Sequence, residues 1–554
     1  MGLPGNPLVW SPRGASDTLD SSTAFSGAMS TLQDLIPDPS TRDLWQCRPA
    51  ATVLSLLDGS GFSSGFSSGF GSGVFNQATF ISALEVIGTR AYGMVSTARN
   101  PGQDEPFAYD IPTNTFITIS GVTPINTPLS PAQQGEWNPP TLALVGTKII
   151  VTHPGFTGVS NAFFGVLDIS NPAAPAWSAT NTAPTALAAV PTWVANFNGR
   201  AFFLVNPTNG QPAAYMSDAL VPTTITNANQ ILTFGDNVPL TCAIGLPLEN
   251  QLGGIVQSLI IFKGVTNLYQ VTGDYALQNL AVNTMNVATG TLAPNTVVTT
   301  NKGVAFIAPD GLRVIDFNAR VGDPIGKAGD GITVPFFGAL VASRMNAAYN
   351  GGLYRVQVQN GAAPGNPQQQ WWYDFVREVW SGPHTIATSL MAPYRNTFIV
   401  TLQGAGAKLW QSDQVQAAAS TYVENGRQLL FSFATPMLPD TDQMAEISMV
   451  QATLHMALVS GSTITVTAQN QDGTILNTAT VVAAGSQTIW GAFLWGQALW
   501  QGIQAALYPR RLDWTEPVVF RRMAIVATGM AAQGFKIGRL HMRYQILGYL
   551  QQDT

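Results

Sequence analysis

A repeated unit of two strands and a turn, closed by an aspartate, runs through the middle of this chain. Apolar runs that alternate and are broken by Gly or Asn, as in NGRAFFLV and NGGLYRVQV, predict hairpins. The closing aspartate recurs about every 50 residues, a spacing typical of four-stranded propeller blades. Because one aspartate at a strand end is explained by a turn alone, the prediction of a β-propeller rests on the recurrence. The aspartates are Asp110, Asp168, Asp218, Asp274, Asp316, Asp374 and Asp413, and their uneven steps leave six to eight blades open.

The pattern changes after about residue 420. Segments such as ISMVQATLHMAL and FKIGRLHMRYQILGYL alternate, and an NQDG turn joins two further strands in STITVTAQNQDGTILNTATVV. These strands predict a β-sandwich. The expected fold class is therefore all-β, with an N-terminal arm over residues 1–85, a β-propeller over 86–420 and a sandwich or platform domain over 421–554.

Charged residues are scarce in this chain. They make up 10% of it, against about 25% in an ordinary globular domain, while 45% of the residues are hydrophobic. Uncharged surface of this extent favours burial against neighbouring subunits, although strands rich in Thr, Asn and Gln would account for the composition without an interface. With a net charge of −6, the chain does not have the excess of basic residues with which proteins bind nucleic acid. A channel along which DNA slides does not need to bind the phosphates tightly.

Residues 58–75, DGSGFSSGFSSGFGSGVF, form a low-complexity tract in which Phe62, Phe66 and Phe70 are four apart. Glycine at this frequency disfavours a helix, and a flexible linker is the simpler interpretation. The alternative is a mobile loop whose phenylalanines dock on a neighbour or converge on an axis as a channel gate. Deleting residues 60–73 from a gate should let a packaged genome leak, whereas deleting a linker should not.

A second unusual stretch lies between Asp472 and Arg510, which enclose 37 uncharged residues. It contains Trp490, Trp495 and Trp500. Gln, Ser and Gly interrupt its apolar residues, so a membrane-spanning helix is not expected. We predict a buried core or subunit-interface segment, with an exposed apolar loop that meets a partner or the host outer membrane as the alternative.

The sequence contains little that indicates catalytic chemistry. The four histidines, His153, His384, His455 and His541, are far apart in the sequence, and no zinc, nucleophile-elbow or nucleotide-binding motif surrounds them. The two cysteines, Cys47 and Cys242, are expected to be buried reduced thiols, and Arg510/Arg511 and Arg521/Arg522 to be solvated strand ends. We therefore expect no enzyme activity, no cofactor and no metal.

Four segments in the middle of the chain resemble one protein family. They are FGDNVPLTCAIGL (234–246), GGIVQSLIIFKGVTNLYQVTGD (253–274), GTLAPNTVVTTNKGVAFIAPDGLRVIDFNARVGDPIG (290–326) and SRMNAAYNGGLYRVQVQNGAAPGNPQQQWWYDFVREVWSGPH (343–384). The resemblance is to the tail hub or nozzle proteins of short-tailed bacteriophages, also called packaged-DNA stabilisation proteins. It is strongest over residues 190–400, and its motifs are structural blade motifs.

This resemblance implies a mechanical function. Nozzle proteins of the family form a homohexameric ring below the portal and its head-to-tail adaptor protein, close the tail after packaging and conduct the double-stranded DNA during ejection. They also dock tail fibre or spike proteins, and they contain no catalytic residues that can be matched to this chain. The implied location is the virion tail.

Two further expectations concern location and function. The amino terminus lacks a basic segment followed by an apolar one, so no secretory signal is expected and assembly is expected in the cytoplasm of the bacterial host. The alternative function is a peripheral tail propeller that binds or cleaves glycans on the host surface, with a pair of carboxylates at one mouth of its channel.

Overall fold

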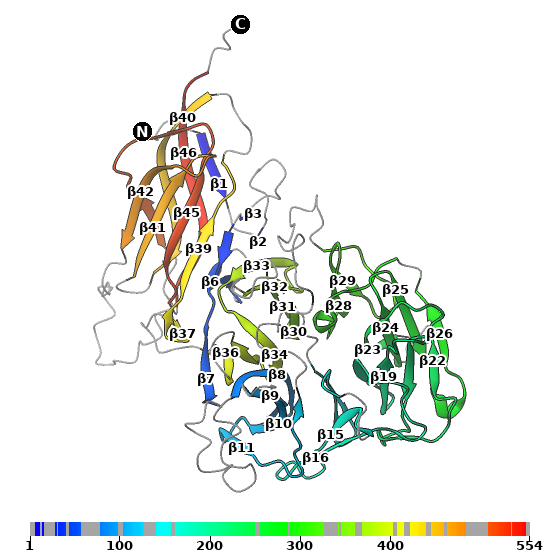
Figure 1. The fold of residues 1–554 in the computed structure, drawn as a ribbon. Helices are drawn as coiled ribbons and strands as arrows, with labels where there is room; N and C mark the ends of the chain where they lie inside the picture. Colours follow the sequence, from blue (N-terminus) through cyan, green and yellow to red (C-terminus); the bar gives the residue numbers. More distant parts are fainter. Residues whose placement is uncertain are drawn as a thin grey trace.

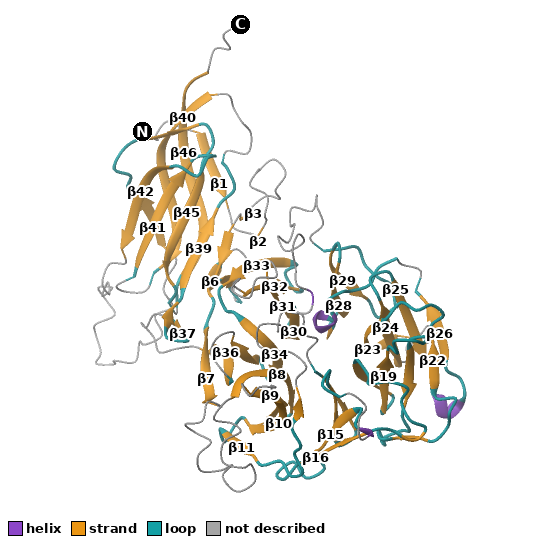
Figure 2. Cartoon of the chain, viewed as in Figure 1, coloured by secondary structure: helices purple, strands orange, loops and turns teal. Residues whose placement is uncertain are grey.

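The computed structural model describes residues 6–10, 14–15, 28–29, 31–39, 44–56, 78–97, 103–126, 140–156, 161–249, 255–285, 288–325, 342, 345–359, 368–402, 407–414, 422–438, 445–458, 462–482, 508–532 and 534–549. It is all-β, and no α-helix occurs among these residues (Figure 2). Two bodies are visible in Figure 1. A group of long strands at the upper left carries both chain ends, and a circle of smaller sheets fills the lower part.

The sheets that form the blades are antiparallel and are built mainly from consecutive strands, as expected for a propeller. Blade 1 contains β8 (Ala78–Ile87), β9 (Arg90–Thr97), β10 (Gln103–Asp110) and β11 (Thr115–Ile117), with β12 (Ile125–Asn126) beside β10. Blade 2 contains β13 (Thr141–Val145), β14 (Lys148–Thr152), β15 (Phe164–Asp168) and β16 (Ala176–Thr180). Blade 3 contains β18 (Trp193–Phe197), β19 (Arg200–Val205), β20 (Ala213–Met216) and β22 (Ile231–Thr233).

The remaining blades follow the same order. Blade 4 contains β23 (Leu240–Glu249), β24 (Ile255–Lys263), β25 (Asn267–Thr272) and β26 (Ala281–Thr284), and blade 5 contains β27 (Val298–Thr300), β28 (Gly303–Ala308) and β29 (Gly311–Ile315). Blade 6 contains β30 (Asn346–Asn350), β31 (Leu353–Gln359), β32 (Gln368–Asp374) and β33 (Val379–His384). Blade 7 contains β34 (Thr388–Tyr394), β35 (Thr397–Leu402), β36 (Lys408–Gln414) and, from the other end of the chain, β7 (Ala50–Leu56).

The seven blades close into a ring. A hydrophobic cluster lies between each blade and the next, as where Tyr92 and Met94 of blade 1 meet Ile149 and Val151 of blade 2. Corresponding clusters join the other neighbours, including blade 7 to blade 1 through Ile399 and Phe107. The propeller is thus seven-bladed, within the range that the sequence left open. Its last blade is completed by β7, so an early and a late segment of the chain share one sheet.

The recurring aspartates have one structural position. Each lies at the end of the third strand of its blade or within two residues of it, from Asp110 in blade 1 to Asp413 in blade 7. Since the third strands run in the same sense relative to the ring, the aspartates lie on one rim of the propeller. The seven positions found in the sequence therefore correspond one to one with the seven blades.

The second body is a β-sandwich, as predicted. Its first sheet contains β40 (Ala445–Ala457) and β46 (Lys536–Tyr549) at the centre, flanked by β1 (Asn6–Trp10), β5 (Leu35–Pro37), β6 (Trp45–Cys47), β43 (Tyr508–Leu512) and β44 (Val518–Phe520). Its second sheet contains β4 (Thr31–Gln33), β39 (Leu430–Ala434), β45 (Ala524–Met530), β41 (Thr463–Gln469) and β42 (Ile475–Val482). Residues such as Leu454 and Leu540 of the first sheet and Phe433, Val466 and Ile525 of the second form the buried core between them.

The domain boundaries differ from those expected. Residues 1–85 do not make a separate arm among the parts described, because β1, β4, β5 and β6 belong to the sandwich and β7 to blade 7. The expected boundary between residues 85 and 86 lies inside β8. The sandwich also shares a sheet with the propeller, since β33 of blade 6 pairs with β4 at Gly382 and Leu32. Short strands that pair with distant partners carry too weak a local pattern to be assigned from sequence.

Candidate functional site

The six aromatic residues singled out in the sequence cannot be placed. Phe62, Phe66 and Phe70 lie outside the described residues, and so do Trp490, Trp495 and Trp500. The candidate sites below therefore come from polar clusters within the described part of the chain, which sequence spacing alone did not reveal.

A cluster of Ser82, Ser96, Asp104 and His153 joins blades 1 and 2 and contains the residue types of a catalytic triad. The ring nitrogen Nε2 of His153 lies 2.9 Å from Asp104 Oδ2, and Nδ1 accepts a hydrogen bond of 2.8 Å from the Gly155 backbone N–H. The proton therefore lies on Nε2, which donates to Asp104. Ser82 Oγ donates to Asp104 Oδ2 at 2.9 Å, and Ser96 Oγ also donates to this carboxylate.

This geometry does not activate a nucleophile. In a triad the serine bonds to one histidine nitrogen and the carboxylate to the other, but here both nitrogens of His153 are engaged elsewhere and the serines bond to the aspartate. His153 and Asp104 are also buried, at 1% and 0% exposed. We interpret the cluster as a hydrogen-bonded link between two blades.

The rim aspartates act mainly as turn caps. Asp168 accepts a hydrogen bond of 2.9 Å from the Ser170 backbone N–H, and Asp316 and Asp374 make equivalent bonds to Asn318 and Val376. The hydrogen bond from Ser170 lowers the pKa of Asp168. Carboxylates engaged in this way keep their charge but stabilise the backbone of their own turns. For these three aspartates, the interpretation as turn residues is thus confirmed together with the recurrence.

Asp413 binds across the boundary between two blades, as Asp274 of blade 4 does with Arg200 of blade 3 at 3.8 Å. Arg355 of β31 donates to Asp413 Oδ2 at 2.7 Å, and Ser412 Oγ donates to the same oxygen at 2.8 Å. The guanidinium of Arg355 also lies 3.6 Å from the ring centroid of Trp372 and 4.3 Å from that of Phe398. Arg355 is only 4% exposed, so ion pair and ring contacts together fasten blade 6 to blade 7.

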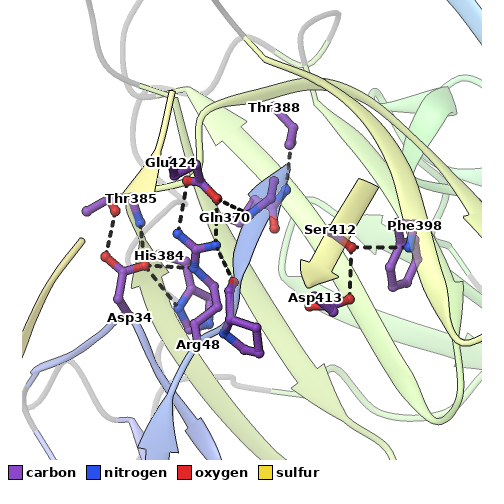
Figure 3. Close-up of polar contacts among 12 residues, drawn as sticks. Asp34, Arg48, Gln370, His384, Thr385, Thr388, Phe398, Ser412, Asp413 and Glu424 are labelled. Atoms are coloured by element: carbon purple, nitrogen blue, oxygen red, sulfur yellow. Dashed lines mark hydrogen bonds and ion pairs between the residues drawn. The ribbon is translucent and has the colours of Figure 1, made fainter. Parts of the chain in front are cut away.

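The most extensive polar cluster lies where the sandwich meets the propeller (Figure 3). Arg48, 1% exposed, lies between Asp34 and Glu424. Its Nε donates to Asp34 Oδ1 at 2.9 Å, while Nη1 and Nη2 donate to the two oxygens of Glu424 at 3.0 and 3.1 Å. Asp34 in turn accepts hydrogen bonds from the backbone N–H and the hydroxyl of Thr385. We call Asp34, Arg48, Glu424 and Thr385 the junction cluster.

The elements that carry the junction cluster explain its position. Arg48 stands between β6 of the sandwich and β7 of blade 7, where the chain first crosses between the two bodies. Glu424 ends β37 (Val423–Glu424), after the chain has left β36 of blade 7 on its way back to the sandwich. Thr385 directly follows β33 of blade 6. The cluster therefore fastens both covalent crossings to each other and to the propeller.

Buried titratable groups surround the junction cluster. His384 is 0% exposed, and burial first and the nearby Arg48 and Arg355 second hold its pKa well below the usual range. Burial likewise raises the pKa of the Cys47 thiol, which with Cys242 is free and buried, as expected. A second contact at the same junction is Asp38, whose carboxylate lies 2.6 Å from Lys536 Nζ and whose backbone carbonyl accepts from Arg377 of blade 6.

Within the described ranges, no three His, Cys, Asp or Glu side chains lie close enough to hold a metal ion together. In the same parts of the chain, no helix has the length and apolar character needed to cross a membrane.

The histidines are less scattered than the sequence indicated. His455 of β40 and His541 of β46 lie side by side, with ring centroids 4.8 Å apart. The sequence separates them by 86 positions and offers no signal for this pairing, because the register between β40 and β46 is set by the sandwich core.

Comparison with known proteins adds little to this picture. No family model matches the chain, and no curated protein matches it. Among solved structures, the chain is similar to the WD40 repeats of RRP9 at 8% identity, with a TM-score of 0.37, covering 66% of this chain and 98% of that one. It is also similar to the β-propeller domain of the Trilobed protease from Pyrococcus furiosus, at 7% identity and a TM-score of 0.31 over 62% and 99% of the two chains. A third similar structure is an exo-β-1,3-galactanase from Phanerochaete chrysosporium, at 9% identity and a TM-score of 0.25 over 73% and 95%.

Similarity at this level carries no argument about activity or partners. The fold assignment stands on the chain's own sheets, which form seven blades closed by an N-terminal strand and a sandwich that shares one sheet with them.

Proposed function

We propose that this chain is a non-enzymatic structural protein of a short-tailed bacteriophage: a tail nozzle that forms a homohexameric ring below the portal and adaptor, retains the packaged DNA and conducts it during ejection. The observation that carries the proposal is the junction cluster, which fastens a propeller and a sandwich into one stiff unit. A subunit under the pressure of a packaged genome has to transmit force between its domains without hinging.

Three structural features support this stiffness. The two covalent crossings meet at the bidentate pair of Arg48 and Glu424. The second sheet of the sandwich continues into blade 6 through β4 and β33. Residues of blade 6 and of both sandwich sheets, such as Tyr354, Leu454 and Phe433, belong to one continuous hydrophobic cluster. Domains joined only by a linker and a small polar interface are expected to move relative to each other, whereas these share a sheet and a core.

The resemblance in sequence supports the same proposal. The four segments that resemble nozzle proteins correspond to β23, β24 and β25 of blade 4, the strands of blade 5 and the strands of blade 6. Blade 6 is the blade that continues into the sandwich. The similarity therefore includes the part of the propeller that carries the connection between the two bodies.

The excess of acidic residues fits a channel through which DNA passes better than a site that binds DNA tightly. The chain has 25 Lys and Arg against 31 Asp and Glu, so a ring of copies does not present an overall basic surface to phosphates. DNA then passes without being held in place. The partners of the proposed ring are the adaptor protein above it, tail fibres or spikes around it and the genome inside it, and its location is the virion tail. Contact with the host outer membrane at ejection belongs to the same proposal.

The test is a cryo-electron microscopy reconstruction of the purified particle that contains this chain. A six-fold ring below the adaptor, with the propeller and the sandwich joined through the junction cluster, is the expected result. A monomer or trimer at the periphery of the tail would overturn the proposal. In that case an assay of glycan release by the isolated chain becomes the next experiment, with bacterial capsule and lipopolysaccharide as substrates.

A further inference from the structure

A glutamine side chain is buried in blade 6 with no hydrogen bond to either end of its amide. Gln357 of β31 is 0% exposed, and neither Oε1 nor Nε2 bonds to any group in the described part of the chain. No other described side chain has both a donor and an acceptor buried in this way. Burial of an amide without hydrogen bonds is strongly unfavourable, so these two atoms require a partner.

The alternation along β31 shows which way Gln357 points. Val356 and Val358 belong to the hydrophobic cluster that blade 6 shares with the sandwich. Successive side chains of a strand point to opposite faces of the sheet, so Gln357 and Arg355 share the other face. Arg355 bonds from this face to Asp413 of blade 7. Gln357 therefore lies in the boundary between blades 6 and 7.

The neighbours of Gln357 on the two adjacent strands are also amides. Gln357 lies opposite Asn346 of β30 on one side and opposite Gln370 of β32 on the other. Both of these side chains bond to blade 7, since Asn346 Oδ1 accepts from the Met391 backbone N–H at 3.1 Å and Gln370 Nε2 donates to Thr388 Oγ1 at 2.7 Å (Figure 3). Three amides thus form a row across blade 6, and the middle one is not bonded to the protein. The surroundings of Gln357 are polar, as a buried water requires.

The chemistry of the amide identifies the ligand. Oε1 of Gln357 needs a donor and Nε2 needs an acceptor, and this holds whichever way the amide is turned. A cation cannot accept a hydrogen bond from Nε2, and the guanidinium of Arg355, two positions away on the same face, repels it. An anion such as chloride has no proton to donate to Oε1. Water both donates and accepts, and buried waters in proteins bond to polar groups that lack another partner.

We propose a buried hydration site in the boundary between blades 6 and 7, where water donates to Oε1 of Gln357 and accepts a hydrogen bond from Nε2. The site does not depend on the proposed ring. In the same boundary, Ala348 of β30 packs against Met391 and Phe398 of blade 7. The contact between blade 6 and the blade that β7 completes thus combines an apolar cluster with a hydrated row of amides.

The experiment is a crystal structure of the full-length chain at a resolution that shows ordered water. We expect density peaks at about 2.7–3.2 Å from Oε1 and from Nε2 of Gln357. Hydrogen bonds from both atoms directly to protein groups, or no peak beside the amide, would overturn the proposal. Crystals grown in sodium bromide or rubidium chloride test the other ligands, because an anomalous peak of bromide or rubidium at this position would show an ion site and would also overturn it.

A pair of variants tests the same site in solution. Gln357→Met removes the amide with little change in volume, and loss of its hydrogen bonds to water should raise the equilibrium constant of unfolding at least about fivefold in urea denaturation. The matched control is Gln230→Met in blade 3. Gln230 is 1% exposed, and its amide bonds directly to the Met216 carbonyl at 3.1 Å, to Asp218 Oδ1 at 2.9 Å and to the Asn227 backbone N–H at 2.8 Å, so this variant should also be destabilised.

An amide without any partner would give the opposite result for Gln357→Met. Methionine then removes a buried group that lowers the stability of the wild type. A denaturation midpoint of Gln357→Met equal to or above that of the wild type, with Gln230→Met destabilised, would therefore overturn the hydration site.

Discussion

Arg48 donates two hydrogen bonds to the carboxylate of Glu424, at 3.0 and 3.1 Å, across 376 positions of sequence. One residue lies where the chain enters the propeller and the other where it returns to the sandwich. The pair therefore closes a loop that contains the whole propeller. Glu424 also accepts a hydrogen bond of 2.8 Å from the Ala51 backbone N–H at the start of β7, so the same carboxylate orients the strand that completes blade 7.

Replacing Arg48 by Met should destabilise the protein strongly. Removing one member of a buried ion pair costs about 3–5 kcal/mol, because the charges left behind are buried without a partner. In this variant both Asp34 and Glu424 lose the guanidinium that carries the opposite charge. The measurement is chemical denaturation of the full-length chain, combined with hydrogen exchange of β6 and β7.

The control for this prediction is Arg427→Met. Arg427 is exposed and lies only three positions from Glu424, and a surface substitution of this kind should change the free energy of unfolding by no more than about 0.5 kcal/mol. Equal denaturation midpoints for the two variants would show that the junction cluster does not stabilise the fold.

His384 should make the protein less stable as the pH falls from 7 to 5. Burial lowers its pKa in the folded state, so the unfolded chain takes up a proton near the ordinary pKa of about 6.5 while the folded chain does not. The free energy of unfolding then falls with decreasing pH, at up to about 1.4 kcal/mol per pH unit for one histidine. His384→Gln should flatten this part of the stability curve, as measured by thermal unfolding at half-unit pH intervals.

His455→Gln is the comparison for the pH experiment, since His455 is only partly buried and its pKa is lowered less strongly than that of His384. It should leave most of the slope between pH 7 and pH 5 in place. A slope unchanged by His384→Gln would mean that this ring takes up a proton without unfolding.

Arg355→Lys should weaken the boundary between blades 6 and 7 although the charge is retained. Lysine cannot place a planar guanidinium over Trp372, where the distance to the ring centroid is now 3.6 Å. We expect a loss of about 1–3 kcal/mol in unfolding free energy, together with faster hydrogen exchange in β31 and β35. Arg395→Lys, at an exposed arginine 5.2 Å from the ring centroid of Tyr394, should behave like the wild type. Similar behaviour of both lysine variants would rule out a special role for the buried stack.

Gly165→Ala should disturb the packing of blade 2. A Cβ at this position would lie 1.9 Å from Trp177 Cη2, so the buried indole has to move, and overpacking of this kind costs about 1–3 kcal/mol. Gly245→Ala in blade 4 meets its nearest atom at 3.6 Å and should be tolerated. Thermal unfolding and tryptophan emission of the two variants test this difference, and equal melting temperatures would contradict it.

The sequence predicted the fold class because its main signals are local. Alternation reports which face of a strand is buried, and the aspartate that follows the third strand caps a turn within a few residues of itself, as Asp168 does with Ser170. Such signals recur wherever the local structure recurs. This is why seven aspartates marked seven blades, and why the alternating strands after residue 420 indicated the sandwich correctly.

The positions of the first strands and of the polar clusters could not be predicted in this way. β4 and β6 contain three residues each, too few for a periodic pattern, and β7 pairs with β36 more than 350 positions later. Arg48, Asp34 and Glu424 are unremarkable in sequence, and only the packing of distant strands brings them together. The same holds for His455 and His541.

The sequence by itself thus determined the repeating unit and the all-β class and limited the blades to six to eight, because turn chemistry and alternation act over a few residues. The tertiary structure decided that blade 7 is completed by β7 and that the sandwich contains strands from the amino-terminal region. It also decided that the two bodies are joined through Arg48 and Glu424. The physical reason is that these contacts depend on burial and strand register across hundreds of residues, where no local propensity specifies the partner.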